Sequence, residues 1–131
     1  MSAPTIGSRQ GKIWGSTQPV FSYNGTEAHV IRVLSGGFCS CHKHTFKWNR
    51  FVIISGRMVV RIFEDNMRIG THQKLLDTTT IGPGEVTDVP HGVRHEFEAL
   101  EDCIALEFYW TELDPDDIDR CGSQGGIRVE D

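Results

Sequence analysis

Residues 36–56 read GGFCSCHKHTFKWNRFVIISG and carry the strongest structural signal in the chain. At their centre, His42 and His44 are separated by one residue, and a second stretch, GEVTDVPHGVRH over residues 84–95, ends at His95. In an extended strand alternate side chains lie on one face, so His42 and His44 point the same way. Imidazole is the commonest protein ligand of borderline metals, and three imidazoles make an open site. The sequence therefore predicts a divalent metal, with Zn, Mn, Ni and Fe as candidates, on these three histidines.

The composition is that of one ordinary globular domain. The chain has 131 residues, 38% of them hydrophobic and 24% charged, with a formal net charge of −5. An acidic balance excludes a general nucleic-acid or anionic-membrane surface. Neither an apolar run of membrane-spanning length nor a signal-peptide core is present, which predicts a cytoplasmic location. The four cysteines are too few and too unevenly placed for a disulfide scaffold.

The middle of the chain reads as short strands separated by turns, which predicts an all-β protein. Runs rich in Val, Ile, Phe and Thr alternate with Gly, Pro, Asn and Asp. The expected strands are 27–34, 38–44, 51–55, 58–64, 78–81, 85–89, 96–99 and 103–110. Ser55-Gly56-Arg57 is expected to be a tight hairpin turn. The predicted organisation is a flexible arm over 1–12, a β-barrel over 13–119 and a mobile tail over 120–131.

Both histidine segments fit the two-part signature of the cupin superfamily, which the chain resembles. In the first part, glycines flank a His-x-His pair with fixed gaps, here at Gly36, His42, His44, Asn49 and Gly56. The second part is a Gly, a Pro-x-Gly turn and a histidine, here at Gly84, Pro90, Gly92 and His95, with Ala99 where Asn is usual. This resemblance implies a single-domain cupin, a jelly-roll β-barrel or double-stranded β-helix.

Asn49 is the larger departure from that signature, because cupins usually carry there the glutamate that is the fourth protein ligand. A neutral amide oxygen is a poorer donor to a divalent cation than a carboxylate. The departure predicts weaker metal retention, a freer coordination position and a preference for an anionic or chelating oxygen ligand. Three neutral imidazoles with exchangeable water resemble catalytic zinc sites and some three-histidine iron oxygenases of the cupin superfamily.

A narrower resemblance, to the cupin domain of type II mannose-6-phosphate isomerase, runs through the flanks. It rests on Trp14-Gly15-Ser16, on Leu106-Glu107 and on residues 116–120, which read DDIDR, with the last two pieces one residue off the usual spacing. It makes Arg120 either a contact to a substrate anion or a salt-bridging residue of the tail. It also implies sugar-phosphate chemistry.

Glu107 and Tyr109 share one face of the last strong strand, and Ile104, Leu106 and Phe108 share the other. If the first face points into the barrel, Glu107 is a candidate general base beside the metal, with burial raising its pKa, and Tyr109 is a second acid/base candidate. If the apolar face points inward, Glu107 lies at the exterior or in an interface. The sequence leaves both open.

Other chemistry-bearing residues have simpler interpretations. Strand alternation places Cys39 and Cys41 on the face opposite the two first histidines, as small buried hydrophobes. His91 lies in the Pro-x-Gly turn and is not expected to be a ligand; His29 and His72 lack partner spacing. The acidic run over 114–119 lacks the ligand alternation and turn glycine of an EF-hand and is expected to be a solvated capping turn.

These observations predict a metal-binding cupin enzyme acting on a small sugar-, sugar-phosphate- or hydroxy-acid-like substrate by metal-assisted isomerisation or epimerisation. Two alternatives stay open: a three-histidine non-haem iron dioxygenase, and a module that binds a small ligand without transforming it. The expected partners are an anionic or polyhydroxylated small molecule and a second copy of the chain in a homodimer, because exposed β edges favour controlled pairing.

Overall fold

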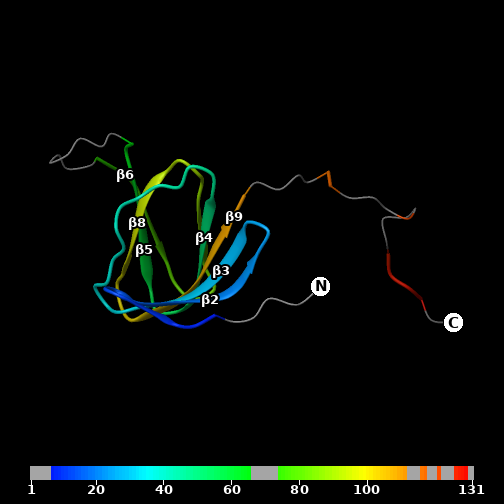
Figure 1. Cartoon of the computed structure of the whole chain (residues 1–131), viewed down its shortest axis with the longest axis horizontal. Helices are drawn as coiled ribbons and strands as arrows, with labels where there is room; N and C mark the ends of the chain where they lie inside the picture. Colours follow the sequence, from blue (N-terminus) through cyan, green and yellow to red (C-terminus); the bar gives the residue numbers. More distant parts are fainter. Residues whose placement is uncertain (1–6, 66–73, 112–115, 118–120, 122–125, 130–131) are drawn as a thin grey trace.

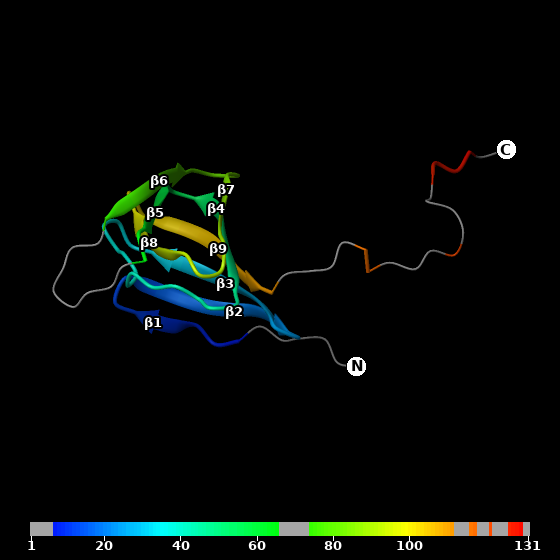
Figure 2. The same ribbon diagram turned by 90° about the horizontal axis from the view of Figure 1, so that it is seen from above.

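Two antiparallel β-sheets face each other and enclose the core (Figures 1 and 2). The structure, a computed structural model, describes residues 7–65, 74–111, 116–117, 121 and 126–129. Over these residues it contains nine strands and no helix, and no span long and apolar enough to form a membrane helix. The predicted all-β class is confirmed.

The larger sheet has six strands in the order β1-β2-β3-β9-β4-β7, and the smaller has three in the order β6-β5-β8. The strand bounds are β1 Gln10–Lys12, β2 Gly15–Tyr23, β3 Thr26–Val33, β4 Trp48–Ser55, β5 Met58–Phe63, β6 Leu75–Ile81, β7 Val86–Val89, β8 Arg94–Ala99 and β9 Cys103–Trp110. Strands distant in sequence are therefore neighbours, with β9 between β3 and β4.

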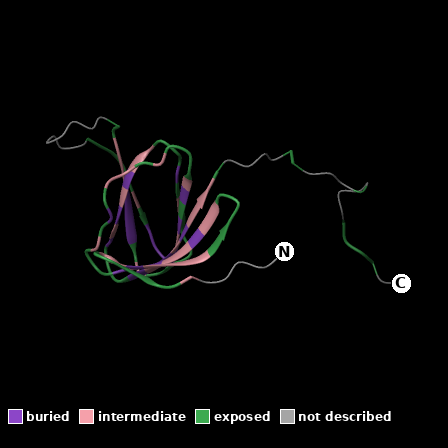
Figure 3. Ribbon diagram, viewed as in Figure 1, coloured by how far each residue is buried: buried purple, intermediate pink, exposed green. Residues whose placement is uncertain are grey.

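Alternation along the central strands separates a buried face from an outer face (Figure 3). On β4, Phe51 and Ile53 are each 1% exposed, whereas the neighbouring Arg50 points to the outer face and is exposed. On β9, Cys103 and Ala105 are buried in the same way. These inward residues pack with Met58, Val60, Phe97 and others into one apolar cluster. Two members of this cluster, Cys39 and Phe97, also line the cavity that contains His42 and His44.

Several elements differ from the sequence prediction at the N-terminal end. Residues 10–12, expected within the flexible arm, form β1 and pair with β2. The nine-residue strand β2 was not predicted; it contains Pro19, and its pairing with β3 shifts register between Pro19 and Phe21. Such a bulge accommodates a proline that cannot donate to the ladder.

The prediction of a hairpin at Ser55-Gly56-Arg57 is wrong, because the two strands that flank the turn do not pair with each other. The tight turn exists, and Gly56 has φ of 80°. However, β4 pairs with β7 and β9, whereas β5 pairs with β6 and β8. The turn therefore passes the chain from one sheet to the other.

Residues 38–44 also do not form the regular strand that was expected. They contact β8 through two isolated bridges, Phe38 with Glu98 and His42 with His95. Because the segment is not a uniform extended strand, the face argument for Cys39 fails. Cys39 is buried in the core and lines the same cavity as His42. Its predicted role as a small buried hydrophobe is confirmed.

Candidate metal centre

Backbone hydrogen bonds hold the two histidine segments together. His42 N donates to His95 O at 3.1 Å, and His95 N donates to His42 O at 2.8 Å. Gly92 N donates to His44 O at 2.6 Å, and Gly92 has φ of 78°, a conformation that glycine adopts without steric cost. Pro90 ends β7 just before this turn. The Pro-x-Gly turn thus places the second segment in register with the first.

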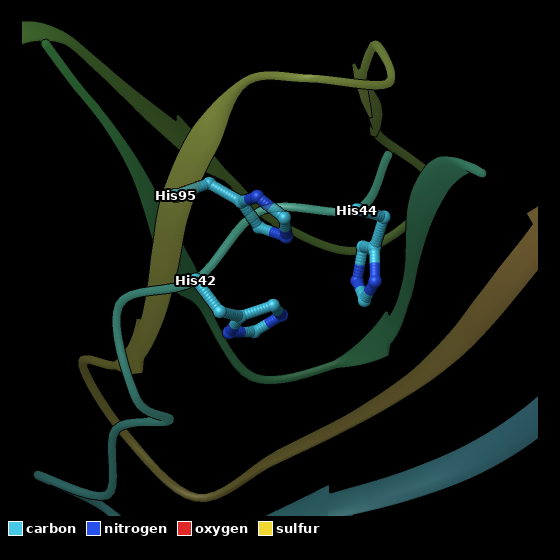
Figure 4. A group of neighbouring side chains, drawn as sticks. All are labelled: His42, His44 and His95. Atoms are coloured by element: carbon cyan, nitrogen blue, oxygen red, sulfur yellow. The ribbon is translucent and has the colours of Figure 1, made fainter. Parts of the chain in front are cut away.

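The three predicted ligands converge inside the barrel (Figure 4). One nitrogen of each of His42, His44 and His95 lies within 4.8 Å of the other two. The ring centroids of His42 and His95 are 4.6 Å apart, and those of His42 and His44 are 4.9 Å apart. Among the described residues, no carboxylate belongs to this group. It is a three-histidine cluster that can hold a metal ion.

Hydrogen bonds fix two of the rings with a free nitrogen facing the cluster. His42 Nδ1 lies 2.6 Å from Ser40 O, and His95 Nδ1 lies 2.9 Å from Val93 O. A carbonyl oxygen only accepts, so both Nδ1 atoms carry the proton and both Nε2 atoms keep a lone pair. His95 Nε2 and His44 Nε2 are buried without a partner. Orphaned acceptors on oriented imidazoles are the arrangement that a bound cation would satisfy.

Burial also keeps the histidines in the form that binds metal. His95 is 1% exposed, and burial lowers its pKa to about 4, with His42 and His44 contributing in the same direction. Burial also lowers the pKa of His44, as do the nearby His42 and Lys47. Metal binding requires neutral imidazole, so neither ring needs to lose a proton at neutral pH.

Glu107 and Tyr109 lie on the inward face of β9, which resolves the alternative that the sequence left open. Glu107 is 9% exposed and lines the cavity with Tyr109. Burial raises the pKa of Glu107, while hydrogen bonds from Tyr109 and Asn49 oppose the shift. The ring of Tyr109 meets that of His44 edge-on at 5.3 Å. A carboxyl group therefore shares the cavity with the histidine cluster and is linked to it through Tyr109.

Asn49 lies in the same polar layer, fully buried at 1% exposure. Its Nδ2 donates to Phe108 O at 3.0 Å, and its side chain also hydrogen-bonds to Glu107. Its Oδ1 is buried without a partner. At the position usually occupied by a ligand carboxylate, this chain therefore has an amide that holds the neighbouring carboxyl group.

The cavity above these groups has a volume of about 380 Å³ and includes residues that sequence spacing did not single out. His29 on β3 lies opposite Glu107 in register and binds Glu27 through its Nε2 at 3.1 Å. Two cations, Lys12 and Lys47, also line the cavity, and Lys47 lies 5.3 Å from the ring centre of Tyr109. The pairing of β3 with β9 brings Glu27 and His29 to the site, so no local motif could reveal these two residues.

The remaining candidates lie elsewhere. His91 is exposed, stands against Trp48 and does not belong to the histidine cluster. Cys41 is half-buried. Arg120 and His72 lie outside the described residues, as does most of the acidic run over 114–119.

Comparison with known proteins identifies the architecture. No protein-family model matches the chain, and no curated protein matches it in sequence. Many solved structures match in fold. KdgF from Halomonas sp. is 17% identical, with a TM-score of 0.64 over 81% of this chain and 89% of that one. The cupin domain of Schizosaccharomyces pombe Cnp3 is 15% identical, with a TM-score of 0.64 over 80% and 69%.

A third similar structure is the oxalate decarboxylase of Bacillus subtilis, described with Mn(II) centres. It is 16% identical, with a TM-score of 0.67 over 85% of this chain but only 30% of that longer one. Identities this low establish a shared fold. The predicted cupin fold is confirmed, while the resemblance of the flanks to mannose-6-phosphate isomerase stays a prediction.

Proposed function

We propose that this cupin-fold chain is a metal-dependent enzyme that isomerises or epimerises a small anionic or polyhydroxylated substrate. The observation that carries the proposal is the cluster of His42, His44 and His95, in which one nitrogen of each ring lies within 4.8 Å of the others. The Nε2 atoms of His44 and His95 are buried there without a hydrogen-bond partner. The Mn(II) centres of the structurally similar oxalate decarboxylase support a metal in this fold. Zn, Mn, Ni and Fe all suit imidazole donors to differing degrees.

The chain's own groups fit proton transfer near such an ion. When bound to the three histidines, a divalent cation supplies a Lewis acid for a carbonyl or hydroxyl oxygen. Glu107, with a pKa raised by burial, is the group that removes and returns a proton in the cavity. Tyr109 and Asn49 position its carboxyl group through hydrogen bonds. Isomerisation and epimerisation both require such a base beside a polarised oxygen.

Two cations in the cavity wall support an anionic or oxygen-rich ligand, because the two carboxyl groups there already have partners: Glu27 binds His29, and Glu107 accepts hydrogen bonds from Tyr109 and Asn49. These cations are Lys12 and Lys47, and neither forms an ion pair among the described residues. A volume of about 380 Å³ accommodates a compact metabolite. Sugar phosphates and hydroxy acids are the substrate classes that combine vicinal oxygens with an anionic group. Arg120 extends this proposal as a second anion contact, and the chain is proposed to act as a homodimer.

The first test is element analysis of protein purified without chelator or histidine tag. Wild type is expected to retain a divalent metal near one equivalent, and His95→Ala to lose it; His91→Ala is the matched control. Metal-loaded protein is then incubated anaerobically in D₂O with sugar phosphates and hydroxy acids, and NMR follows deuterium entry at carbon. Glu107→Gln should bind the metal but abolish exchange. An empty wild-type site at neutral pH would overturn the proposal.

A three-histidine iron dioxygenase is the second candidate, because no carboxylate joins the histidine cluster in the described part of the chain. It predicts oxygen uptake that requires ferrous iron, whereas the isomerase works without oxygen and with zinc or manganese. A metal-loaded protein that binds such ligands but neither exchanges deuterium nor consumes oxygen would instead be a binding module.

A further inference from the structure

A second charged cavity lies on the outer face of the larger sheet, away from the histidine cluster. It has a volume of about 290 Å³, and Arg9 and Arg32 line it. Arg32 alternates along β3 with Ile31 and Val33, each 1% exposed in the core, so its side chain is on the opposite face. The cavity is therefore separate from the interior of the barrel.

Arg32 carries an unusual feature for a cation. Among the described residues, five buried side-chain polar atoms lack a hydrogen-bond partner, and three of them belong to His44, Asn49 and His95, in or beside the histidine cluster. Arg32 Nη1 is the only one of the five that belongs to a permanently charged group. A buried charged donor without a partner is costly, so this atom indicates a missing acceptor.

The surroundings of Arg32 add a second cation. Arg9 Nε donates to Ser16 Oγ at 3.0 Å, and Ser16 is the cross-strand partner of Arg32 in the pairing of β2 with β3. Neither arginine forms an ion pair within the described part of the chain. Two guanidinium groups thus border one cavity, and neither is ion-paired to a described residue.

The one acidic group at the cavity is already engaged. Asp102 lines the rim and its Oδ1 accepts a hydrogen bond from Ser35 N at 2.8 Å. Asp102 precedes Cys103, the residue paired with Val33, so it lies beyond the end of β3 and not across from Arg32. Asp102 forms no ion pair with either arginine, so the cavity carries two guanidinium groups against one carboxylate, an excess of one positive charge among the described residues that line it.

We propose that Arg9 and Arg32 form a binding site for an oxyanion, the phosphate or carboxylate group of a small molecule. The planar guanidinium matches two oxygens of such a group, which would supply the acceptor that Arg32 Nη1 lacks. The site is independent of the metal centre and of the proposed reaction. It can therefore be tested on the metal-free protein, and its failure would leave the metal proposal untouched.

The probe is inorganic phosphate, titrated at constant ionic strength while backbone amide shifts are followed by NMR. Saturable shifts are expected at Ser16 and Arg32. Two variants, Arg9→Gln and Arg32→Lys, should each weaken phosphate binding about tenfold or more. Arg32→Lys keeps the charge but loses the planar pair of donors that can bind two oxygens. Arg50→Gln is the matched control, because that guanidinium lies on the same sheet but already binds both oxygens of Asp88. It should bind phosphate like wild type.

An acetate titration distinguishes the two sources of the oxyanion. Tighter binding of phosphate points to a phosphorylated molecule, and equal or tighter binding of acetate points to a carboxylate; either result supports the site. Shifts that do not saturate, or equal weakening in Arg50→Gln and Arg32→Lys, would overturn it.

A stability measurement gives an independent check. Without oxyanion, Arg32→Met keeps the aliphatic stem and removes an uncompensated charge, so its melting temperature should equal or exceed that of wild type. Phosphate should raise the melting temperature of wild type and not that of Arg32→Met. A clear loss of stability in phosphate-free Arg32→Met would show that Arg32 already has a stabilising partner and would refute the proposal.

Discussion

Acidification of the metal-free protein should unfold it largely through His95. This side chain is 1% exposed, and burial lowers its pKa to about 4, whereas an unfolded chain has a histidine pKa of about 6.5. Between these values the unfolded state binds more protons, so stability falls as the pH falls. The difference corresponds to about 3 kcal/mol by pH 4, a large share of the roughly 5–15 kcal/mol that stabilises a domain.

Other groups titrate in the same range and must be separated from His95. Burial lowers the pKa of His44 as well, which adds to the loss. Burial raises the pKa of Glu107, so the folded state takes up that proton first and acidification favours folding there. His95→Gln removes the titrating ring and leaves both other groups. The comparison therefore rests on how the difference between wild type and His95→Gln changes with pH.

The assay is urea unfolding followed by tryptophan fluorescence, in chelator, from pH 7.5 to pH 4. Wild type should lose about 3 kcal/mol more than His95→Gln over this range. His91→Gln is the control, because His91 is exposed, and its curve should run parallel to wild type. If wild type and His95→Gln lose stability in parallel, His95 is not held neutral by burial and the reasoning fails.

Four other outcomes follow from the structure. Zinc at a hundredfold excess over its dissociation constant should stabilise wild type by about 2.7 kcal/mol, and calorimetry should find no such gain in His44→Ala. Asn49→Glu should bind zinc at least about tenfold more tightly in a chelator competition, since it adds a carboxylate to the cavity. Gly56→Ala should lower the free energy of unfolding in urea by about 2 kcal/mol or more, because the added Cβ would lie 2.2 Å from the Asp102 carbonyl oxygen. Gly84→Ala is the control: its φ is similar but its Cβ would meet open space, so the loss should be smaller. Alkylation mapped by mass spectrometry should leave Cys39 unmodified in the native state, since burial raises its pKa to about 12; rapid labelling would contradict this.

The histidine motifs allowed the fold and the cluster to be predicted because they resemble the two-part signature of the cupin superfamily. A His-x-His pair and a Pro-x-Gly turn three residues before His95 specify which backbone groups can meet. The structure realises this through the hydrogen bonds between His42 and His95 and between Gly92 and His44. Short motifs of this kind combine ligand residues with turn residues, so they remain informative where the general pattern of strands is ambiguous.

The alternation of side chains along a strand predicted which face a residue occupies less reliably. The interpretation of Cys39 assumed uniform extension over residues 38–44, but that segment touches β8 only through isolated bridges. One irregular residue exchanges the two faces. β2 was missed for a related reason, because Pro19 argues against a strand unless a bulge absorbs it.

The turn at Gly56 shows why local signals could not give the topology. A positive φ suits a hairpin and a crossing between sheets equally. The choice depends on long-range packing: the Gly56 backbone approaches Asp102 so closely that a Cβ would meet its carbonyl oxygen. His29 and Glu27 were overlooked on the same ground, because they reach the cavity only through the pairing of β3 with β9.

The missing carboxylate at Asn49 has a different meaning once Glu107 is placed. The sequence suggested a site that had lost one negative charge, yet the structure positions a buried carboxyl group within hydrogen-bonding contact of the Asn49 amide. A carboxyl group is therefore present in the cavity but outside the histidine cluster. A carboxylate that coordinates a metal is a poor base, whereas one held beside the metal by an amide and a phenol keeps its lone pairs for a proton. Under the proposed function, the amide at position 49 therefore serves to hold the base Glu107 and not to coordinate the metal.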